Sequence, residues 1–147
     1  MIITDIYSQL RRDEGTRLFV YPDDRGFNTI GNGHNLDANP LPFDVSGGIT
    51  LAQCDQILHD DVACIGAHLV SHLPWIMQLD DARRGVLLNM AFNMGVPGEL
   101  TFHHTLDDTQ AGRYQQSAAD MKASLWYTQV GARADRLVQQ MLTGVWQ

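Results

Sequence analysis

The stretch RRDEGTRLFVYPDDRGFNTIGNGH, residues Arg11–His34, decides the fold, because its pattern changes from helix to β-hairpin within a few residues. Glycine commonly ends helices, so Gly15 is expected to close a short N-terminal helix with Glu14 at its C-terminal end. RLFVY and FNTIG are β-favouring runs, and the Pro-Asp-Asp sequence between them is typical of a turn. We therefore predict a short helix followed by a hairpin.

A long helix is predicted after this hairpin and a loop rich in glycine, proline and asparagine. It begins at Thr50, which has capping-box spacing with Gln53, and its apolar residues keep helical spacing as far as Leu69. Asp80 and Gly95 bound another helix, and three shorter helices are expected in the rest of the chain. The predicted fold class is α+β, with a small β-hairpin lobe joined by the long helix to a larger helical lobe.

The length of 147 residues predicts one domain. We place its small lobe at about residues 15–60 and its helical lobe at about residues 61–147, together with the N-terminal helix. The composition, 44% hydrophobic and 18% charged, is that of an ordinary globular protein. Cys54 and Cys64 lie about 15 Å apart in the predicted helix, too far for a disulfide, so both are predicted to be reduced core thiols.

The net charge of −7 argues against a general nucleic-acid-binding protein, because phosphate contacts need clustered Lys and Arg and only ten such residues are present. No stretch is long and apolar enough to span a bilayer, and the first residues lack the apolar core of a secretory signal. We therefore expect a protein that is made in a cytoplasm without a signal peptide and does not insert into a membrane.

Glu14, Asp23 and Thr29 lie close together in the sequence and carry the groups that could break a glycosidic bond. Such a reaction needs an acid at the leaving oxygen and, on the opposite side, a carboxylate that activates water or attacks the sugar. A threonine hydroxyl could help to hold the water. The alternative is purely structural, because aspartates in turns usually stabilise the turn and glutamates at helix ends are usually solvated.

The pattern Glu-x8-Asp-x5-Thr resembles the catalytic segment of the phage-type lysozymes, the T-even phage lysozyme family of glycoside hydrolases. Three further segments resemble that family with its spacing: ITLAQCDQILHDDV (Ile49–Val62), LDDARRGVLLNMAFNMG (Leu79–Gly95) and WYTQVGARADRLVQQMLTGVW (Trp126–Trp146). The resemblance covers nearly the whole chain. It implies a lysozyme-like fold and an endolysin or muramidase activity on peptidoglycan, without a metal or organic cofactor.

The resemblance also implies roles for individual residues. Glu14 would be the general acid, and Asp23 and Thr29 would position and activate water on the other face of the sugar, in a reaction that inverts configuration. For inversion, the two carboxyl groups should lie about 6.5–9.5 Å apart, which leaves room for the water. Arg133 matches an arginine that approaches the catalytic glutamate in the family.

Other residues match supporting positions of the family. His34 and Asp61 match an ion pair that bridges the hairpin lobe and the long helix, with a catalytic-base role for His34 as the alternative. Phe92, Thr105 and Asp120 match positions that line the saccharide cleft. Core packing is the alternative for Phe92, and Asp120 stands where the family usually has an amide.

A metal site is the competing interpretation of His68 and His72, because zinc amidases also cut peptidoglycan. The two histidines are spaced i, i+4, which places them on one helix face. The His-Glu-x-x-His pattern is absent, however, and no acidic residue lies between them. We therefore predict a solvated helix end and no metal.

Two departures from the family bear on how the protein reaches its substrate. Only fourteen residues separate His34 from Ile49, fewer than in the family, so the small lobe is expected to be trimmed. The acidic charge removes long-range attraction to anionic cell walls. We therefore expect delivery by a holin, within a virion or as a secreted toxin.

The expected protein is a monomer that is made in the host cytoplasm and acts on the wall in the periplasm during host lysis. Two alternatives stay open. A lytic transglycosylase would use the muramic 6-hydroxyl in place of water. A peptidoglycan-binding module would keep the fold without activity.

Overall fold

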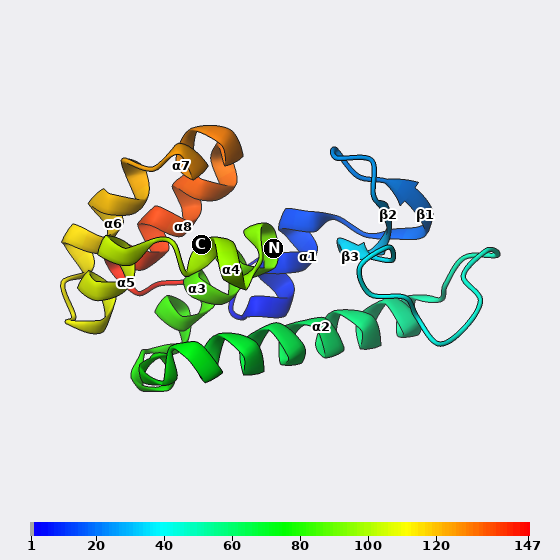
Figure 1. The fold of residues 1–147 in the computed structure, drawn as a ribbon, viewed down its shortest axis with the longest axis horizontal. Helices are drawn as coiled ribbons and strands as arrows, with labels where there is room; N and C mark the ends of the chain where they lie inside the picture. The colour runs from blue at the N-terminus through cyan, green and yellow to red at the C-terminus, as the bar shows by residue number, and fades with distance from the viewer. Residues whose placement is uncertain (1) are drawn as a thin grey trace. The chain divides into compact units, whose positions relative to one another are not determined.

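The computed structural model describes residues 2–147, which form two compact units. We call Tyr7–Cys64 the sheet unit, and Ile65–Gln147 with the residues that precede Tyr7 the helical unit. Each unit has its own hydrophobic cluster. Helix α2 (Leu51–His72) contributes its first part to the sheet unit and its last part to the helical unit (Figure 1). The α+β class predicted from the sequence is confirmed.

The sheet unit contains a three-stranded antiparallel sheet in the order β1-β2-β3 (Figure 1). Its elements before α2 are α1 (Ile6–Glu14), β1 (Arg17–Pro22), β2 (Asn28–Gly31) and β3 (His34–Asn35). The predicted helix and hairpin are confirmed. The sequence did not predict β3, because two residues among glycines and asparagines carry no alternation of apolar and polar side chains.

The start of α2 packs against the sheet and closes a small core. This core consists of Ile30, Ile49, Cys54 and Ile57, all at most 7% exposed. The predicted capping box is present, because the Thr50 N–H donates to Gln53 Oε1 at 2.9 Å and the Gln53 N–H donates to Thr50 Oγ1 at 3.1 Å.

The two cysteines of α2 are both free, but they differ in exposure. Cys54 is buried, whereas Cys64 is exposed, so the prediction of two core thiols is wrong for Cys64. Ten residues are not a whole number of helical turns, and the two side chains therefore point in different directions.

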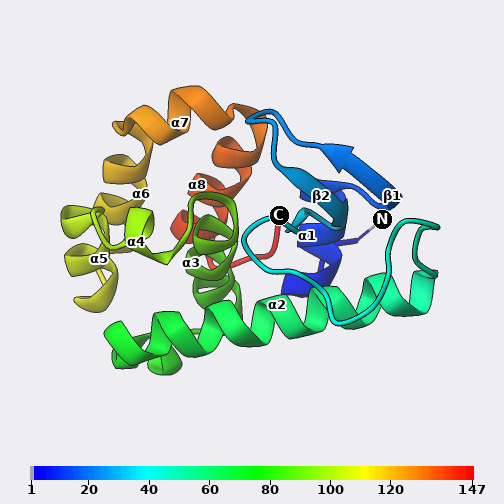
Figure 2. The same ribbon diagram turned by 45° about the vertical axis from the view of Figure 1, so that its right-hand side comes forward.

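The helical unit is built from the end of α2 and a succession of shorter helices (Figure 2). These are the 3₁₀ helix η1 (Pro74–Gln78) and the α-helices α3 (Asp81–Met94), α4 (Val96–Glu99), α5 (His103–Gln110), α6 (Tyr114–Lys122), α7 (Leu125–Val130) and α8 (Ala132–Thr143). The predicted boundaries of α3 are confirmed, because Asp80 accepts a hydrogen bond from the Arg83 N–H at 2.9 Å and Gly95 ends the helix at φ +82°.

The prediction of three short helices after Gly95 is wrong. Within residues 96–147 there are five, because α4 was not expected and the segment YQQSAADMKASLWY divides into α6 and α7. Ser124 causes this division, since its side chain accepts from the Tyr127 N–H at 3.2 Å and so starts α7.

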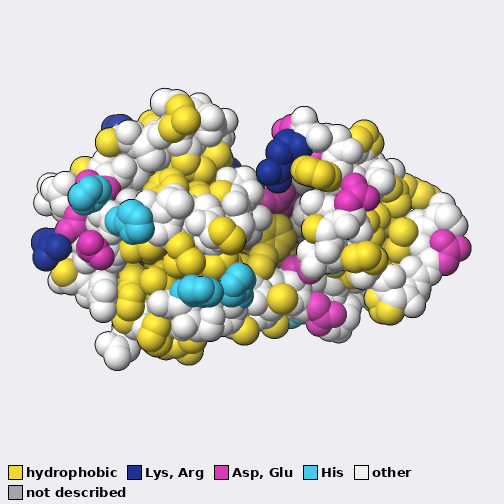
Figure 3. Space-filling model, in the orientation of Figure 1, with side chains coloured by type: hydrophobic (Ala, Val, Ile, Leu, Met, Phe, Trp, Pro, Cys, Tyr) yellow, Lys and Arg dark blue, Asp and Glu magenta, His cyan; other side chains and the backbone are white. Residues whose placement is uncertain are grey.

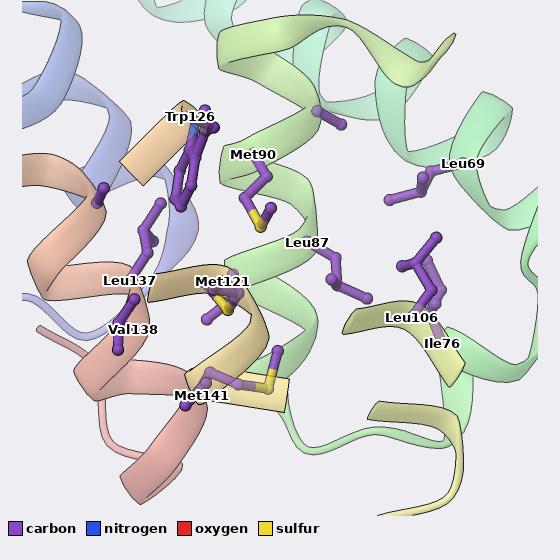
Figure 4. Close-up of a cluster of buried hydrophobic side chains, with 14 of the residues drawn as sticks. Leu69, Ile76, Leu87, Met90, Leu106, Met121, Trp126, Leu137, Val138 and Met141 are labelled. Carbon is purple, nitrogen blue, oxygen red and sulfur yellow. The ribbon is translucent and has the colours of Figure 1, made fainter. Parts of the chain in front are cut away.

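Apolar side chains of α3, α6 and α8 form the centre of the helical unit (Figure 4). Leu87, Met90, Met121 and Met141 are completely buried there. The indole of Trp146 lies directly against α3, where a Cβ atom on Gly85 would come within 2.3 Å of it. Within residues 2–147, no helix has the length and apolar character needed to cross a membrane.

Candidate active site

Glu14 lies in the sheet unit at the end of α1 and is half-buried. Gly15, with φ +72°, lets the chain leave the helix and enter β1. The Glu14 side chain lies against the backbone of the turn between β2 and β3, because a Cβ atom on Gly33 would be 2.7 Å from Glu14 Oε2. The carboxyl group is therefore held next to the sheet.

Asp23 lies in the turn between β1 and β2, and its two carboxylate oxygens have different surroundings. Oδ1 accepts hydrogen bonds from the backbone N–H groups of Arg25 at 2.8 Å and Phe27 at 2.9 Å. The structural interpretation of this aspartate is thus correct for Oδ1. Among the described residues none donates to Oδ2, so this oxygen can still bind a ligand.

Thr29 is on β2 and only 3% exposed. Its hydroxyl donates to the Phe27 carbonyl oxygen at 2.9 Å. Because its one hydrogen is used, the hydroxyl oxygen can only accept from any further partner. A water molecule could donate to it.

Tyr21 is a residue of this site that the sequence did not single out. It stands opposite Thr29 in the β1–β2 register, so the two side chains lie on the same face of the sheet. Burial raises the pKa of the Tyr21 phenol above 10.0, and the negative charge of Glu14 raises it further while Arg17 opposes this. The Arg17 guanidinium lies 4.3 Å from the centre of the Tyr21 ring. Its place beside Thr29 follows from the strand register, which no sequence pattern indicated.

His34 and Asp61 form the predicted ion pair within the sheet unit, and His34 is 6% exposed. Nδ1 lies 2.8 Å from Asp61 Oδ2, and Nε2 lies 2.7 Å from the Asn39 carbonyl oxygen. Both partners accept only, so both ring nitrogens must carry hydrogen. Burial lowers the pKa of His34, but the hydrogen bond and charge of Asp61 and the Asn39 carbonyl more than offset this, so it lies above 6.5. Both ring nitrogens of His34 are thus engaged within the sheet unit.

A separate cavity of about 590 Å³ lies in the helical unit and is lined by both Thr105 and Asp120. Phe102 and Trp126 give it apolar walls, and Figure 3 shows that hydrophobic side chains and histidines share this face. Phe92, on α3, is half-buried and lies outside this lining. The structure thus brings together two of the three predicted cleft residues.

Asp120 faces a second carboxyl group, that of Asp108. Burial and the hydrogen bond to Asp108 raise the pKa of Asp120 above 3.8, whereas the Arg113 guanidinium, 2.7 Å away, lowers that of Asp108. Of the two carboxyl groups, Asp120 therefore binds a proton more readily than Asp108.

Arg133 is on α8, and its Nε donates to Asn89 Oδ1 at 2.8 Å. His68 and His72 are exposed near the end of α2, with ring centres 5.1 Å apart. Within residues 2–147, no group of three His, Cys, Asp or Glu side chains is placed to hold a metal ion.

Within this α+β fold the sheet unit holds a half-buried glutamate beside the sheet, a turn aspartate with one oxygen that accepts no hydrogen bond from the described residues, and a buried threonine. The chain belongs to the phage lysozyme family, whose model matches residues 11–141.

Individual relatives cover the chain to different extents. It is 34% identical over 155 residues to the pre-baseplate central spike protein Gp5 of Enterobacteria phage T4, covering 92% of this chain but only 27% of that protein. It is 28% identical over 164 residues to the probable T4-type lysozyme 1 of Dictyostelium discoideum, covering 97% of this chain and 96% of the relative. It is 30% identical over 90 residues to the endolysin of Salmonella phage P22, covering 60% of this chain and 59% of that endolysin.

Proposed function

We propose that this protein is an N-acetylmuramidase, which hydrolyses the β-1,4 bond between N-acetylmuramic acid and N-acetylglucosamine in peptidoglycan and inverts configuration. Membership of the phage lysozyme family supports the substrate class. The observation that carries the proposal is that Asp23 Oδ2 and Thr29 Oγ1, both in the sheet unit, each keep an acceptor position that a water molecule can use.

Glu14 is the proposed general acid. It donates its proton to the glycosidic oxygen while the bond from that oxygen to C1 of the muramic acid breaks. Its half-buried position beside the β2–β3 turn supports this role, because a fixed carboxyl group loses little freedom when it reaches the substrate.

Asp23 and Thr29 hold the attacking water in this proposal. The water donates one hydrogen to Asp23 Oδ2 and the other to Thr29 Oγ1, so its lone pair is directed at C1. As the new bond to C1 forms, Asp23 accepts the proton. Because the hairpin turn already fixes Asp23 Oδ1, the second oxygen has one orientation.

Thr105 and Asp120, with Phe92, are the proposed contacts to the glycan chain in the helical unit. The apolar walls and polar rim of the 590 Å³ cavity suit a sugar or its attached peptide. In the sheet unit, His34 and Asp61 support the site without contacting substrate, and Arg133 is the proposed supporting residue of the helical unit. The enzyme needs no metal or organic cofactor and acts as a monomer.

We place this activity in host lysis. The endolysin among the relatives favours synthesis in the host cytoplasm, release by a holin and action on the wall in the periplasm. Delivery within a virion is the second route, favoured by the similarity to a phage spike protein.

Mass spectrometry of the products from purified peptidoglycan tests the proposal. Wild-type protein should release muropeptides with reducing ends, and both Glu14→Gln and Asp23→Asn should abolish them. Anhydro-muropeptides would instead identify a lytic transglycosylase. Binding without any product would identify a peptidoglycan-binding module.

A further inference from the structure

Gly33 is the last residue of the tight turn between β2 and β3. Ile30 pairs with His34 across this turn, which leaves three residues, 31–33, to reverse the chain. Gly33 has φ +78°, in the left-handed region that favours glycine. Its position is therefore fixed by the sheet and by its own backbone.

The Glu14 side chain occupies the space that a side chain at position 33 would need. A Cβ atom on Gly33 would lie 2.7 Å from Glu14 Oε2, 3.0 Å from Cδ and 3.3 Å from Cγ. Distances this short cannot persist, so either the turn or the carboxyl group would have to move. The carboxyl group is the more flexible of the two.

Asn32, the neighbour of Gly33, ties the same turn to the residues that follow Glu14. Its Nδ2 donates to the Gly15 carbonyl oxygen at 2.5 Å and to Thr16 Oγ1 at 2.8 Å. Its Oδ1 accepts from the Cys54 thiol at 3.2 Å, and the side chain is 3% exposed. Both N–H hydrogens of the Asn32 amide and one lone pair of its oxygen thus take part in hydrogen bonds.

We propose that Asn32 and Gly33 are positioning residues for the acid Glu14, an inference that rests on the proposed glycosidase function. Asn32 sets the distance between the turn and the end of α1, and the bare backbone of Gly33 forms the surface on which the carboxyl group lies. Neither residue contacts the sugar. Misplacing a reacting group by about 1 Å can cost about 10²-fold in rate, so this contact matters for catalysis.

The variant Gly33→Ala tests the proposal, with Gly112→Ala as its matched control. Gly112 has φ +76°, and a Cβ atom there would have no neighbour within 4 Å. Both variants therefore place an alanine at a positive φ, and both should lower the Tm. Only Gly33→Ala should lower kcat, by about 10²-fold with little change in KM, because only it displaces the acid.

Carboxyl ¹³C NMR gives a readout that does not depend on activity. The chain contains only two glutamates, Glu14 and Glu99, so labelling with [¹³C]glutamate gives two side-chain carboxyl resonances. Gly33→Ala should shift the Glu14 resonance and leave that of Glu99 in place. Gly112→Ala should shift neither.

An unshifted Glu14 resonance in Gly33→Ala, or a shift without loss of kcat, would overturn the proposal. If the wild type released no muropeptides, the proposed function would fail. If Gly33→Ala still shifted the Glu14 resonance in such an inactive protein, Gly33 would be a structural contact only. Its proposed role in positioning a catalytic acid would then be wrong.

A second variant covers the case in which Gly33→Ala does not fold. Asn32→Ala removes the tie to Gly15 and Thr16 but leaves the glycine in the turn. It should broaden or shift the Glu14 resonance and lower kcat about tenfold at unchanged KM, with the Glu99 resonance as its internal control. A wild-type Glu14 resonance in this variant would contradict the role of Asn32.

Discussion

Asn32 in the sheet unit and Glu99 in the helical unit are both buried polar side chains, 3% and 0% exposed. Asn32 donates to two oxygens and accepts from the Cys54 thiol. Neither carboxyl oxygen of Glu99 has a hydrogen-bond partner among the described residues, and burial raises the pKa of Glu99 well above 4.5. Asn32 thus fixes geometry through its partners, whereas the unpaired Glu99 carboxyl group costs stability.

The same contrast separates the two glutamates. Glu14 ends a helix and lies against the β2–β3 turn, where a carboxyl group can meet a substrate. Glu99 is the last residue of α4 and is completely buried in the helical unit. Burial raises the pKa of Glu99, a residue inside the helical unit, so a raised pKa does not by itself identify a catalytic group in this protein.

The largest expected effect compares the matched substitutions Glu14→Gln and Glu99→Gln. Glu14→Gln should lower the rate of peptidoglycan hydrolysis by about 10²–10⁴-fold, because an amide cannot donate the proton that the leaving group needs. Glu99→Gln should keep the wild-type rate. Turbidity of permeabilised cells measures both. An equal loss of rate in the two variants would show that Glu14 has no special role as the general acid.

A second prediction concerns the paired histidine of the sheet unit. Asp61→Asn should cost about 2–3 kcal/mol at pH 6, because it removes the charge that compensates the buried His34 cation. The folded pKa of His34 is raised, so the stabilisation is complete below the unfolded value near 6.5 and is lost as pH rises through the folded pKa. Urea unfolding between pH 5.5 and 9 should show this loss in the wild type.

The pH dependence should be much weaker in Asp61→Asn. The control is His68→Gln, which changes an exposed histidine and should retain the wild-type slope. A slope that survives in Asp61→Asn would mean that another group titrates in this range.

Features set by neighbouring residues could be predicted from the sequence. The capping box of Thr50 and Gln53 and the boundaries of α3 at Asp80 and Gly95 were correct, because each depends on a few consecutive residues. Glu14, Asp23 and Thr29 could be selected only by their resemblance to a family. Their spacing alone could not exclude ordinary turn and helix-end roles.

Features set by packing could not be predicted. The contact of Gly33 with Glu14 joins residues 19 positions apart and exists only once β2 and β3 have paired. The burial of Glu99 depends on where the four-residue helix α4 packs, and no sequence pattern indicated that helix. Tyr21 likewise entered the site through its register with Thr29.

A third prediction uses Glu99 to test the cost of the unpaired carboxyl group. Glu99→Met should raise the free energy of unfolding by about 1–3 kcal/mol at pH 7, because it replaces a buried polar group without a partner by an apolar side chain of similar size. The folded pKa of Glu99 is raised, so wild-type stability falls as pH rises above 4.5 towards that pKa. Urea unfolding at pH 5, 7 and 9 should show this fall in the wild type only.

Glu99→Gln separates the cost of ionising the buried group from the cost of burying a polar group without a partner. It removes the ionisation and hence the pH dependence, but it leaves an unpaired polar group in the core. Its stability at pH 5 should therefore stay near that of the wild type and below that of Glu99→Met. Equal stability of all three proteins at pH 9 would mean that Glu99 has a partner in solution.

The smallest expected effect concerns Asp120, the other carboxyl group of the helical unit with a buried oxygen that lacks a partner among the described residues. Its pKa is raised by burial and by Asp108, so stability falls as pH rises from 3.8 through the folded pKa. Asp120→Asn supplies an N–H that can donate to Asp108 at every pH. Because Asp120 is partly exposed, the gain above the folded pKa should stay below about 1 kcal/mol.

Thermal unfolding at pH 3 and pH 7 measures this gain, with Asp107→Asn as the control because Asp107 is an exposed aspartate of the same helix, α5. Asp120→Asn should match the wild type at pH 3, below the raised pKa of Asp120, and exceed it at pH 7. Asp107→Asn should change neither value. A loss of stability at pH 7 in Asp120→Asn would mean that the ionised Asp120 carboxylate stabilises the fold, and would contradict the cost assigned to its unpaired oxygen.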